Sequence, residues 1–204
     1  DSYYAEGKLT KAYKHYSSAI KKFPKSDRKA NAQLNQAMIA EKQKRWSDAE
    51  FIYEKFYYEK PSHPLTELAK TRLDNLMKKG FANKPSVSVR LSRVDRLLSR
   101  RSLEKAQADL DAFENENLPS SQRLSYTSKR AVLAYRQENF SEAIAMFKML
   151  SKKQGRGHYY QNQTWLARCY STQGQVKEAV EVYNQLAKKY RGSSQGQKAQ
   201  FMGA

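Results

Sequence analysis

The stretch FSEAIAMFKML, from Phe140 to Leu150, contains the pattern that decides the fold. Ala143 has a large apolar residue three positions before it and further apolar residues four and seven positions after it, at Phe140, Phe147 and Leu150. Residues with these offsets share one face of an α-helix. We therefore expect a helix whose buried face is centred on a small residue.

The same pattern recurs along the chain around four other alanines, Ala12, Ala49, Ala106 and Ala179. Five copies of one spacing predict a structural unit that repeats. The apolar residues around the four alanines are, in order, Leu9, Tyr16 and Ala19; Trp46, Tyr53 and Phe56; Leu103, Leu110 and Phe113; and Val176, Tyr183 and Leu186.

Small and apolar residues also precede three of the copies, which predicts a partner helix that approaches each one closely. They are Leu34, Ala37 and Ala40, then Ala131 and Ala134, then Ala167 and Tyr170.

Turn residues flank the predicted helices. Gly7 and Gly174 stand five positions before Ala12 and Ala179, where the chain must reverse, and Pro24 and Pro61 stand where a helix must end. Ser47 with Glu50 predicts a capping box at the start of the helix that contains Ala49.

The long gap between Ala49 and Ala106 has room for one more helix. Its apolar residues Leu68, Leu73, Leu76 and Met77 predict a helix at about residues 65–79.

These features resemble the tetratricopeptide repeat over nearly the whole chain. The resemblance implies an all-α fold, a right-handed superhelix of antiparallel helix pairs, with about five repeats and about ten or eleven helices. Residues 1–204 are then a single helical-repeat module. Because the pattern is interrupted at both ends, we expect the module to be a fragment of a longer protein.

The charge predicts an acidic partner. The chain has 38 Lys and Arg against 20 Asp and Glu, a formal net charge of +18. Nucleic acid, anionic lipid and acidic cell-wall polymers would all be attracted to such a surface, and a charged surface that only keeps the protein in solution is the alternative. No apolar run reaches the ~18 residues of a membrane-spanning helix.

Nothing in the sequence indicates catalysis, a cofactor or a metal. His15, His63 and His158 have no ligand partners at suitable spacing, and Cys169 lies on an apolar helix face, where a small buried residue is expected. The glycines at 155 and 157 resemble a phosphate-binding loop, but we interpret them as the turn between two repeats.

An arginine stripe is the clearest binding candidate. On a helix that starts near Val87, the five arginines Arg90, Arg93, Arg96, Arg100 and Arg101 would lie beside a narrow apolar stripe. Such a stripe could bind several phosphates or carboxylates, although a solvated face explains the pattern as well. Its direction stays open, since one more residue in a turn rotates a helix face by about 100°.

Paired tyrosines are a second candidate for ligand contact. Tyr159 and Tyr160 lie near a helix end, where one of the two is expected to be exposed and able to stack on a sugar or a base. In contrast, Tyr16, Tyr53, Tyr170 and Tyr183 occupy repeat positions that predict burial.

The C-terminal half is similar to the α-superhelical region of soluble lytic transglycosylases. The similarity rests on the run from Ala131 to Leu150 and on Trp165-Leu166-Ala167, Gly174, Lys189-Tyr190-Arg191-Gly192-Ser193 and Ala199-Gln200-Phe201. It implies a non-catalytic region that holds or guides the glycan strand of peptidoglycan in the bacterial periplasm, within a parent enzyme. The catalytic Glu-Ser pair of that family does not occur in this sequence.

Two other functions stay open. A general protein-interaction scaffold, which would be cytoplasmic, is the simplest alternative. Nucleic-acid binding suits the charge but lacks a recognised module and is less favoured. The oligomeric state does not follow from the sequence.

Overall fold

The computed structural model describes residues 2–153 and 156–204, and these residues form helices without any strand. The sequence pattern predicts about ten or eleven helices, and the described residues form twelve. The first of these, α1, has only four residues. No described helix is long and apolar enough to cross a membrane. The helices are α1 (Ser2–Ala5), α2 (Leu9–Lys22), α3 (Lys29–Lys42), α4 (Trp46–Glu59), α5 (Thr66–Lys78), α6 (Val87–Ser99), α7 (Leu103–Asp111), α8 (Ser120–Arg136), α9 (Phe140–Lys153), α10 (Arg156–Thr172), α11 (Val176–Lys189) and α12 (Ser194–Gly203).

Each copy of the repeat pattern starts a helix. The first residues of α2, α4, α7, α9 and α11 are the first apolar residues of the five copies. The extra helix expected at about 65–79 is α5. The two prolines also have the predicted role, because α2 ends two residues before Pro24 and α4 ends two residues before Pro61.

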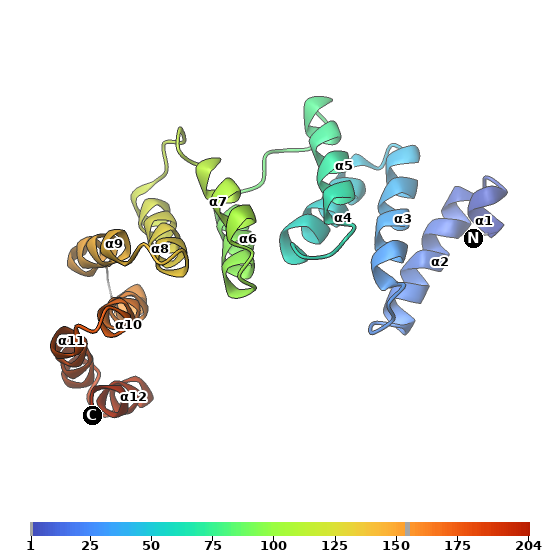
Figure 1. Ribbon diagram of the computed structural model, residues 1–204. Coiled ribbons are helices and arrows are strands. Elements are labelled where there is room, and N and C mark those ends of the chain that lie inside the picture. The colour runs from blue at the N-terminus through green and yellow to red at the C-terminus, as the bar shows by residue number, and fades with distance from the viewer. Residues whose placement is uncertain (1, 154–155) are drawn as a thin grey trace. The chain divides into compact units, whose positions relative to one another are not determined.

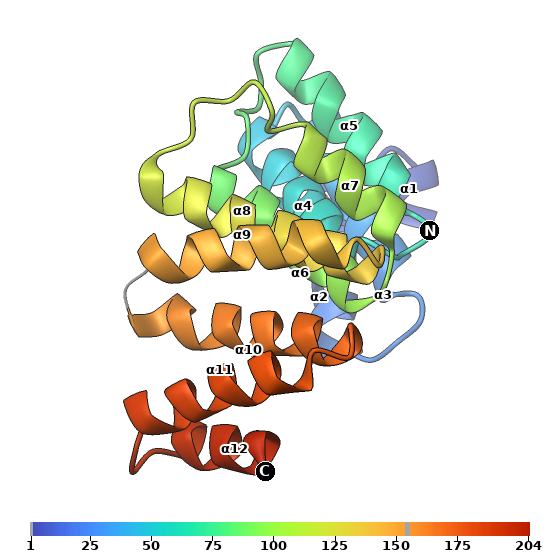
Figure 2. The same cartoon turned by 60° about the vertical axis from the view of Figure 1, so that its left-hand side comes forward.

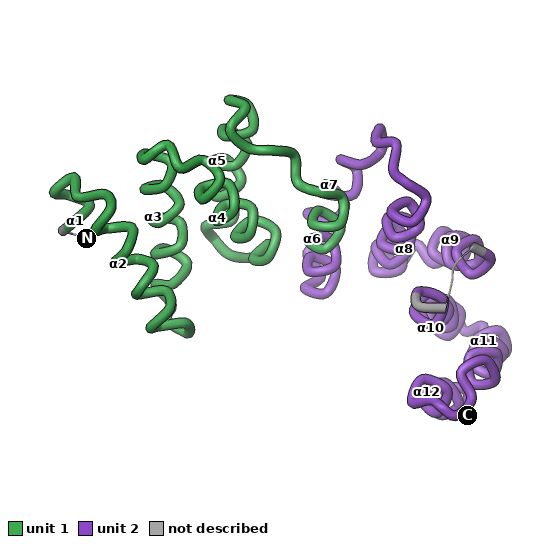
Figure 3. The backbone as a smooth tube through the Cα atoms, turned by 180° about the vertical axis from the view of Figure 1, so that it is seen from behind, with its two compact units in different colours: residues 1–93 green, residues 94–204 purple. Residues whose placement is uncertain are grey.

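The chain divides into two compact units, residues 1–93 and 94–204, with the boundary inside α6 (Figure 3). A single module over residues 1–204 stays a prediction. In the first unit, α2, α3, α4 and α5 pack on one another in chain order (Figure 1). Their core is centred on Leu34, Ala37, Tyr53 and Leu73.

The second unit repeats this arrangement. Helices α8 to α12 pack in chain order, each on the next, and Figure 2 shows them as successive layers. One apolar cluster extends through these layers and includes Ala134, Phe147, Ala167, Tyr183 and Ala199.

The repeat alanines lie at the centre of the helix contacts. Ala49, Ala106 and Ala143 are fully buried, Ala12 is 2% exposed and Ala179 is 4% exposed. The four tyrosines predicted to be core residues are buried as well. An alanine at these points lets two helix backbones approach closely, and the large residues around it fill the space on either side.

Two apolar residues do not have the predicted burial. Val176 is 62% exposed although it occupies the first position of its copy, and Leu68 of α5 is 40% exposed. In α5 the buried stripe instead passes through Ala69, Leu73 and Leu76.

The turns that precede the five repeat helices share one backbone geometry. The residue two positions before each helix has a positive φ: Gly7, Lys44, Arg101, Glu138 and Gly174. In the last of these turns, the N–H of Gln175 donates to the carbonyl of Tyr170 at 2.9 Å and the N–H of Gly174 donates to that of Ser171 at 3.1 Å. This pair of bonds is a Schellman motif, which requires a left-handed residue where the preceding helix ends.

The predicted capping box is wrong. Helix α4 begins at Trp46, one residue before Ser47, and its N-cap Arg45 makes no side-chain capping bond. The Glu50 carboxylate instead accepts a hydrogen bond of 2.8 Å from the backbone N–H of Asn83.

The left-handed turns predict opposite effects for two substitutions in the second unit. Gly174→Ala should lower the free energy of unfolding by about 1 kcal/mol, because only its φ of +75° is unfavourable and no atom lies within 4 Å of the added Cβ. Glu138→Gly should raise it by about 0.5 kcal/mol, since glycine adopts a positive φ without strain. Urea denaturation measures both, and a change of the same sign in both would contradict the shared geometry.

Candidate functional site

The arginine stripe is not one exposed face. Arg93 is only 3% exposed, so the prediction that it lies on a solvent-facing surface is wrong. Its Nη1 donates a hydrogen bond of 2.7 Å to the carbonyl oxygen of Tyr57, and its guanidinium lies 3.8 Å from the centre of the Tyr57 ring. Arg93 thus holds α6 against the end of α4 within the first unit.

The other four arginines are distributed over helix and turn. Arg90 and Arg96 are half-buried on α6. Arg100 and Arg101 lie beyond the end of α6 and are exposed, and Arg101 is the left-handed residue of the turn before α7. Because the helix ends at Ser99, the spacing that placed all five on one helical face does not apply to the last two.

Tyr159 and Tyr160 are both half-buried in the first part of α10, so the expectation that one of them is exposed is wrong. The Tyr160 hydroxyl donates to the carbonyl of Gln195 at 3.3 Å, and its ring meets the Tyr190 ring edge-on at 5.3 Å. The Lys189 ammonium lies 3.6 Å from the centre of the Tyr159 ring. These contacts connect α10 to the end of α11 and the start of α12.

Histidine, cysteine and carboxylate side chains were considered above as possible metal ligands or nucleophiles. No group of three or more His, Cys, Asp or Glu side chains there could hold a metal ion. Cys169 is fully buried, and burial raises the pKa of its thiol to about 11, so the thiol is protonated near neutral pH. His63 accepts a hydrogen bond from the N–H of Leu65 and lies edge-on to Phe56 at 5.2 Å, which gives it a structural role. Of the two glycines predicted to form an inter-repeat turn, the one at 155 is outside the described residues, and the one at 157 lies at the start of α10, so the prediction is wrong for it.

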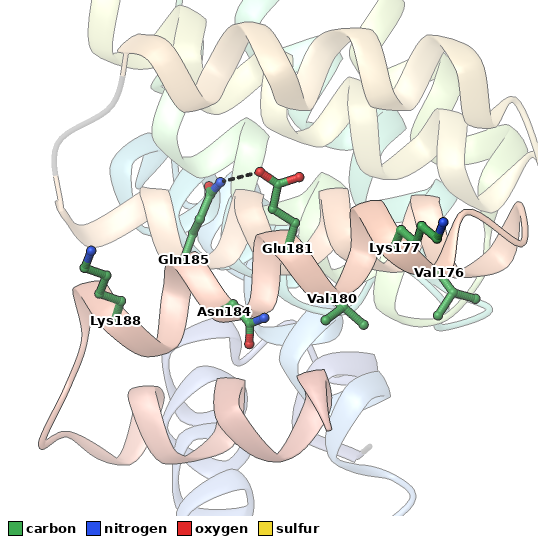
Figure 4. A pocket seen from close by; sticks show the side chains of 7 residues that line it. All are labelled: Val176, Lys177, Val180, Glu181, Asn184, Gln185 and Lys188. Carbon is green, nitrogen blue, oxygen red and sulfur yellow. Dashed lines mark hydrogen bonds between the residues drawn. The ribbon is translucent and has the colours of Figure 1, made fainter.

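An open surface pocket lies along one side of α11 (Figure 4). Its volume is about 600 Å³, and Val176 and Val180 provide its apolar part. Gln185 donates to Glu181 at 3.4 Å, between the two valines and the far end of the pocket. Apolar groups among hydrogen-bonding and charged ones are typical of protein interfaces. The remaining residues that line this pocket are Lys177, Asn184 and Lys188.

None of these residues is among the binding candidates predicted from the sequence. Lys177, Glu181, Asn184 and Lys188 recur every three or four residues, a spacing that places them on one helical face. That spacing was available in the sequence, but the stripe of buried residues beside it dominates the pattern of α11.

The burial of Arg93 predicts a stability role that Arg100 does not share. Arg93→Ala should lower the free energy of unfolding by about 2 kcal/mol, because it removes a charge-assisted hydrogen bond and the contact with the Tyr57 ring. Arg100→Ala removes the same charge from an exposed turn and should change stability by less than about 0.5 kcal/mol. Equal losses in urea denaturation would show that Arg93 is not a packing residue.

Two family profiles match the chain, and both are described as Tetratricopeptide repeat. One matches residues 1–64 and the other matches residues 134–200. A search of the curated proteins finds no match. The matched segments contain α1 to α4 and α9 to α11, in which four of the five repeat alanines lie. Over these two segments the chain is therefore built of tetratricopeptide repeats.

Proposed function

We propose that the chain is a non-catalytic scaffold that binds other proteins. The observation that carries this proposal is the tetratricopeptide architecture, matched in both halves of the chain and supported by buried alanine contacts. In such repeats the small residues hold the helices together, so the outward side chains can vary to suit a partner. The mixed apolar and polar face of α11 supports the same proposal.

Affinity purification tests the scaffold. The full chain serves as bait, and a basic protein of similar net charge serves as the control, because a charge of +18 retains polyanions nonspecifically. We expect a protein partner that is retained by this chain alone, that remains after digestion with nuclease and lysozyme, and that rebinds as a purified protein. Loss of every retained protein after either digestion would contradict the proposal.

Peptidoglycan binding is the second candidate. It is favoured by the similarity of Ala131 to Leu150 and of Lys189 to Ser193 to the superhelical region of lytic transglycosylases, together with the positive charge. The chain would then hold the glycan strand in the periplasm next to a catalytic domain of its parent enzyme. Nucleic-acid binding has only the charge in its favour.

Purified sacculi, RNA and heparin distinguish these candidates from the scaffold. At matched ionic strength, a scaffold binds all three with similar, steeply salt-dependent affinity, as expected of charge alone. Binding to sacculi that persists at a salt concentration releasing RNA and heparin would favour the peptidoglycan candidate over the scaffold.

A further inference from the structure

A second, smaller cavity lies where two repeat turns meet in the second unit. It has a volume of about 220 Å³ and is separate from the face of α11. Arg101 comes from the turn before α7, Tyr135 and Arg136 from the end of α8, and Glu138 from the turn before α9. Arg101 and Glu138 have equivalent places in successive repeats, since each is the left-handed residue two positions before its helix. The repeat geometry itself thus brings these charges together.

The two arginines that line this cavity have no anionic partner among the described residues. Neither Arg101 nor Arg136 forms a hydrogen bond or an ion pair with a side chain of the described residues, and Glu138 forms none with them. The Nε of Arg136 is buried and has no acceptor within the part of the chain described. A buried donor without an acceptor is destabilising, so an added acceptor that a small shift of the guanidinium can reach would be favourable.

Aromatic side chains lie next to Arg136 and on the cavity wall. The Arg136 guanidinium lies 5.9 Å from the centre of the Trp165 ring, and the same ring meets Tyr135 at 5.2 Å. The Tyr135 hydroxyl and Thr172 Oγ1 lie 3.3 Å apart, while Phe140 packs edge-on to Tyr135 at 5.6 Å. The contact with the Trp165 ring leaves the positive charge of Arg136 unneutralised.

The size of the cavity limits what it can accept. About 220 Å³ corresponds to roughly seven water molecules at ~30 Å³ each, and it is below the ~300 Å³ at which small-molecule pockets begin. One short acidic side chain fits within this volume, whereas a nucleotide or a disaccharide would extend beyond it.

The charge balance favours a carboxylate over a phosphate. Two arginines and one glutamate give the cavity a net charge of about +1 at neutral pH. A carboxylate carries a single negative charge, and its two oxygens match the donors of a guanidinium. A phosphate dianion would leave the cavity with a net charge of about −1 and would lose more hydration on entering it.

We propose that this cavity between the turns before α7 and α9 binds a carboxylate side chain, that of an aspartate or glutamate, through Arg101 and Arg136. The source of that side chain, an acidic segment of a protein partner, rests on the proposed scaffold function. The cavity itself does not, because a small probe can test it on the purified chain.

Nuclear magnetic resonance tests the cavity with N-acetylglutamate amide as the probe and N-acetylglutamine amide as its neutral match. The signals are the Arg136 Nε–H and the backbone N–H groups of Glu138 and Phe140. We expect the acidic probe to cause saturable shifts with a Kd on the order of 1–10 mM, and the neutral probe to cause none. Inorganic phosphate at equal ionic strength should bind more weakly than the acidic probe.

Three variants locate the binding. Arg136→Gln and Arg101→Gln should each raise the Kd of the acidic probe at least fivefold. Glu138→Gln should lower this Kd about twofold. Arg191→Gln removes the same charge from an exposed loop of the same unit and should leave the Kd unchanged. If the Arg136→Gln variant does not fold, Arg101→Gln still tests the site, because Arg101 is exposed and its replacement should not disturb the core.

Three outcomes would overturn the carboxylate site. The first is that the neutral probe causes shifts equal to those of the acidic probe. The second is that the Kd of the acidic probe is unchanged in both single variants, Arg101→Gln and Arg136→Gln. The third is that phosphate binds more tightly than the acidic probe. If the acidic probe does not bind, the scaffold proposal still stands, because affinity purification tests it separately. If affinity purification finds no protein partner, binding of the acidic probe to the cavity still supports the carboxylate site.

Discussion

The close approach of helices at a small residue is the contact on which this structure depends. Each repeat helix has an alanine at the centre of its buried face, and the five alanines are between 0% and 4% exposed. Around them stand large residues such as Tyr53, Phe147 and Leu186, which fill the space between neighbouring helices. Because α2 to α5 in the first unit and α8 to α12 in the second pack mainly on their neighbours in the chain, each of these stacks is a sum of similar local contacts.

The sequence predicts this part of the fold well because the alanine spacing reflects helix geometry directly. All five repeat helices begin at the first apolar residue of their copy of the pattern, and α5 lies where the long gap has room for it. The turns could be predicted only where glycine marks them. At Lys44, Arg101 and Glu138 the same left-handed backbone carries an ordinary side chain, and no residue type there indicates it.

The candidate site could be predicted much less well, for a reason that Arg93 illustrates. A helical-face argument treats an arginine as solvent-exposed, but the Tyr57 ring and carbonyl provide a buried place for this one. That place depends on a residue 36 positions away, so spacing along α6 alone could not reveal it. Arg101 was predicted to be a binding residue, yet its partner in the cavity, Arg136, was not, because the two are brought together by turns rather than by a helix period.

The account is tested most directly by enlarging one repeat alanine and comparing it with an exposed alanine of the same helix. Ala143→Leu adds the same atoms as Ala145→Leu, but Ala143 is fully buried and Ala145 is exposed on α9. Urea denaturation should show a loss of about 2 kcal/mol or more for Ala143→Leu, because the helices can no longer approach, and a change within about 0.5 kcal/mol for Ala145→Leu. Equal stability of the two variants would contradict the claim that close contact at the repeat alanines holds the structure together.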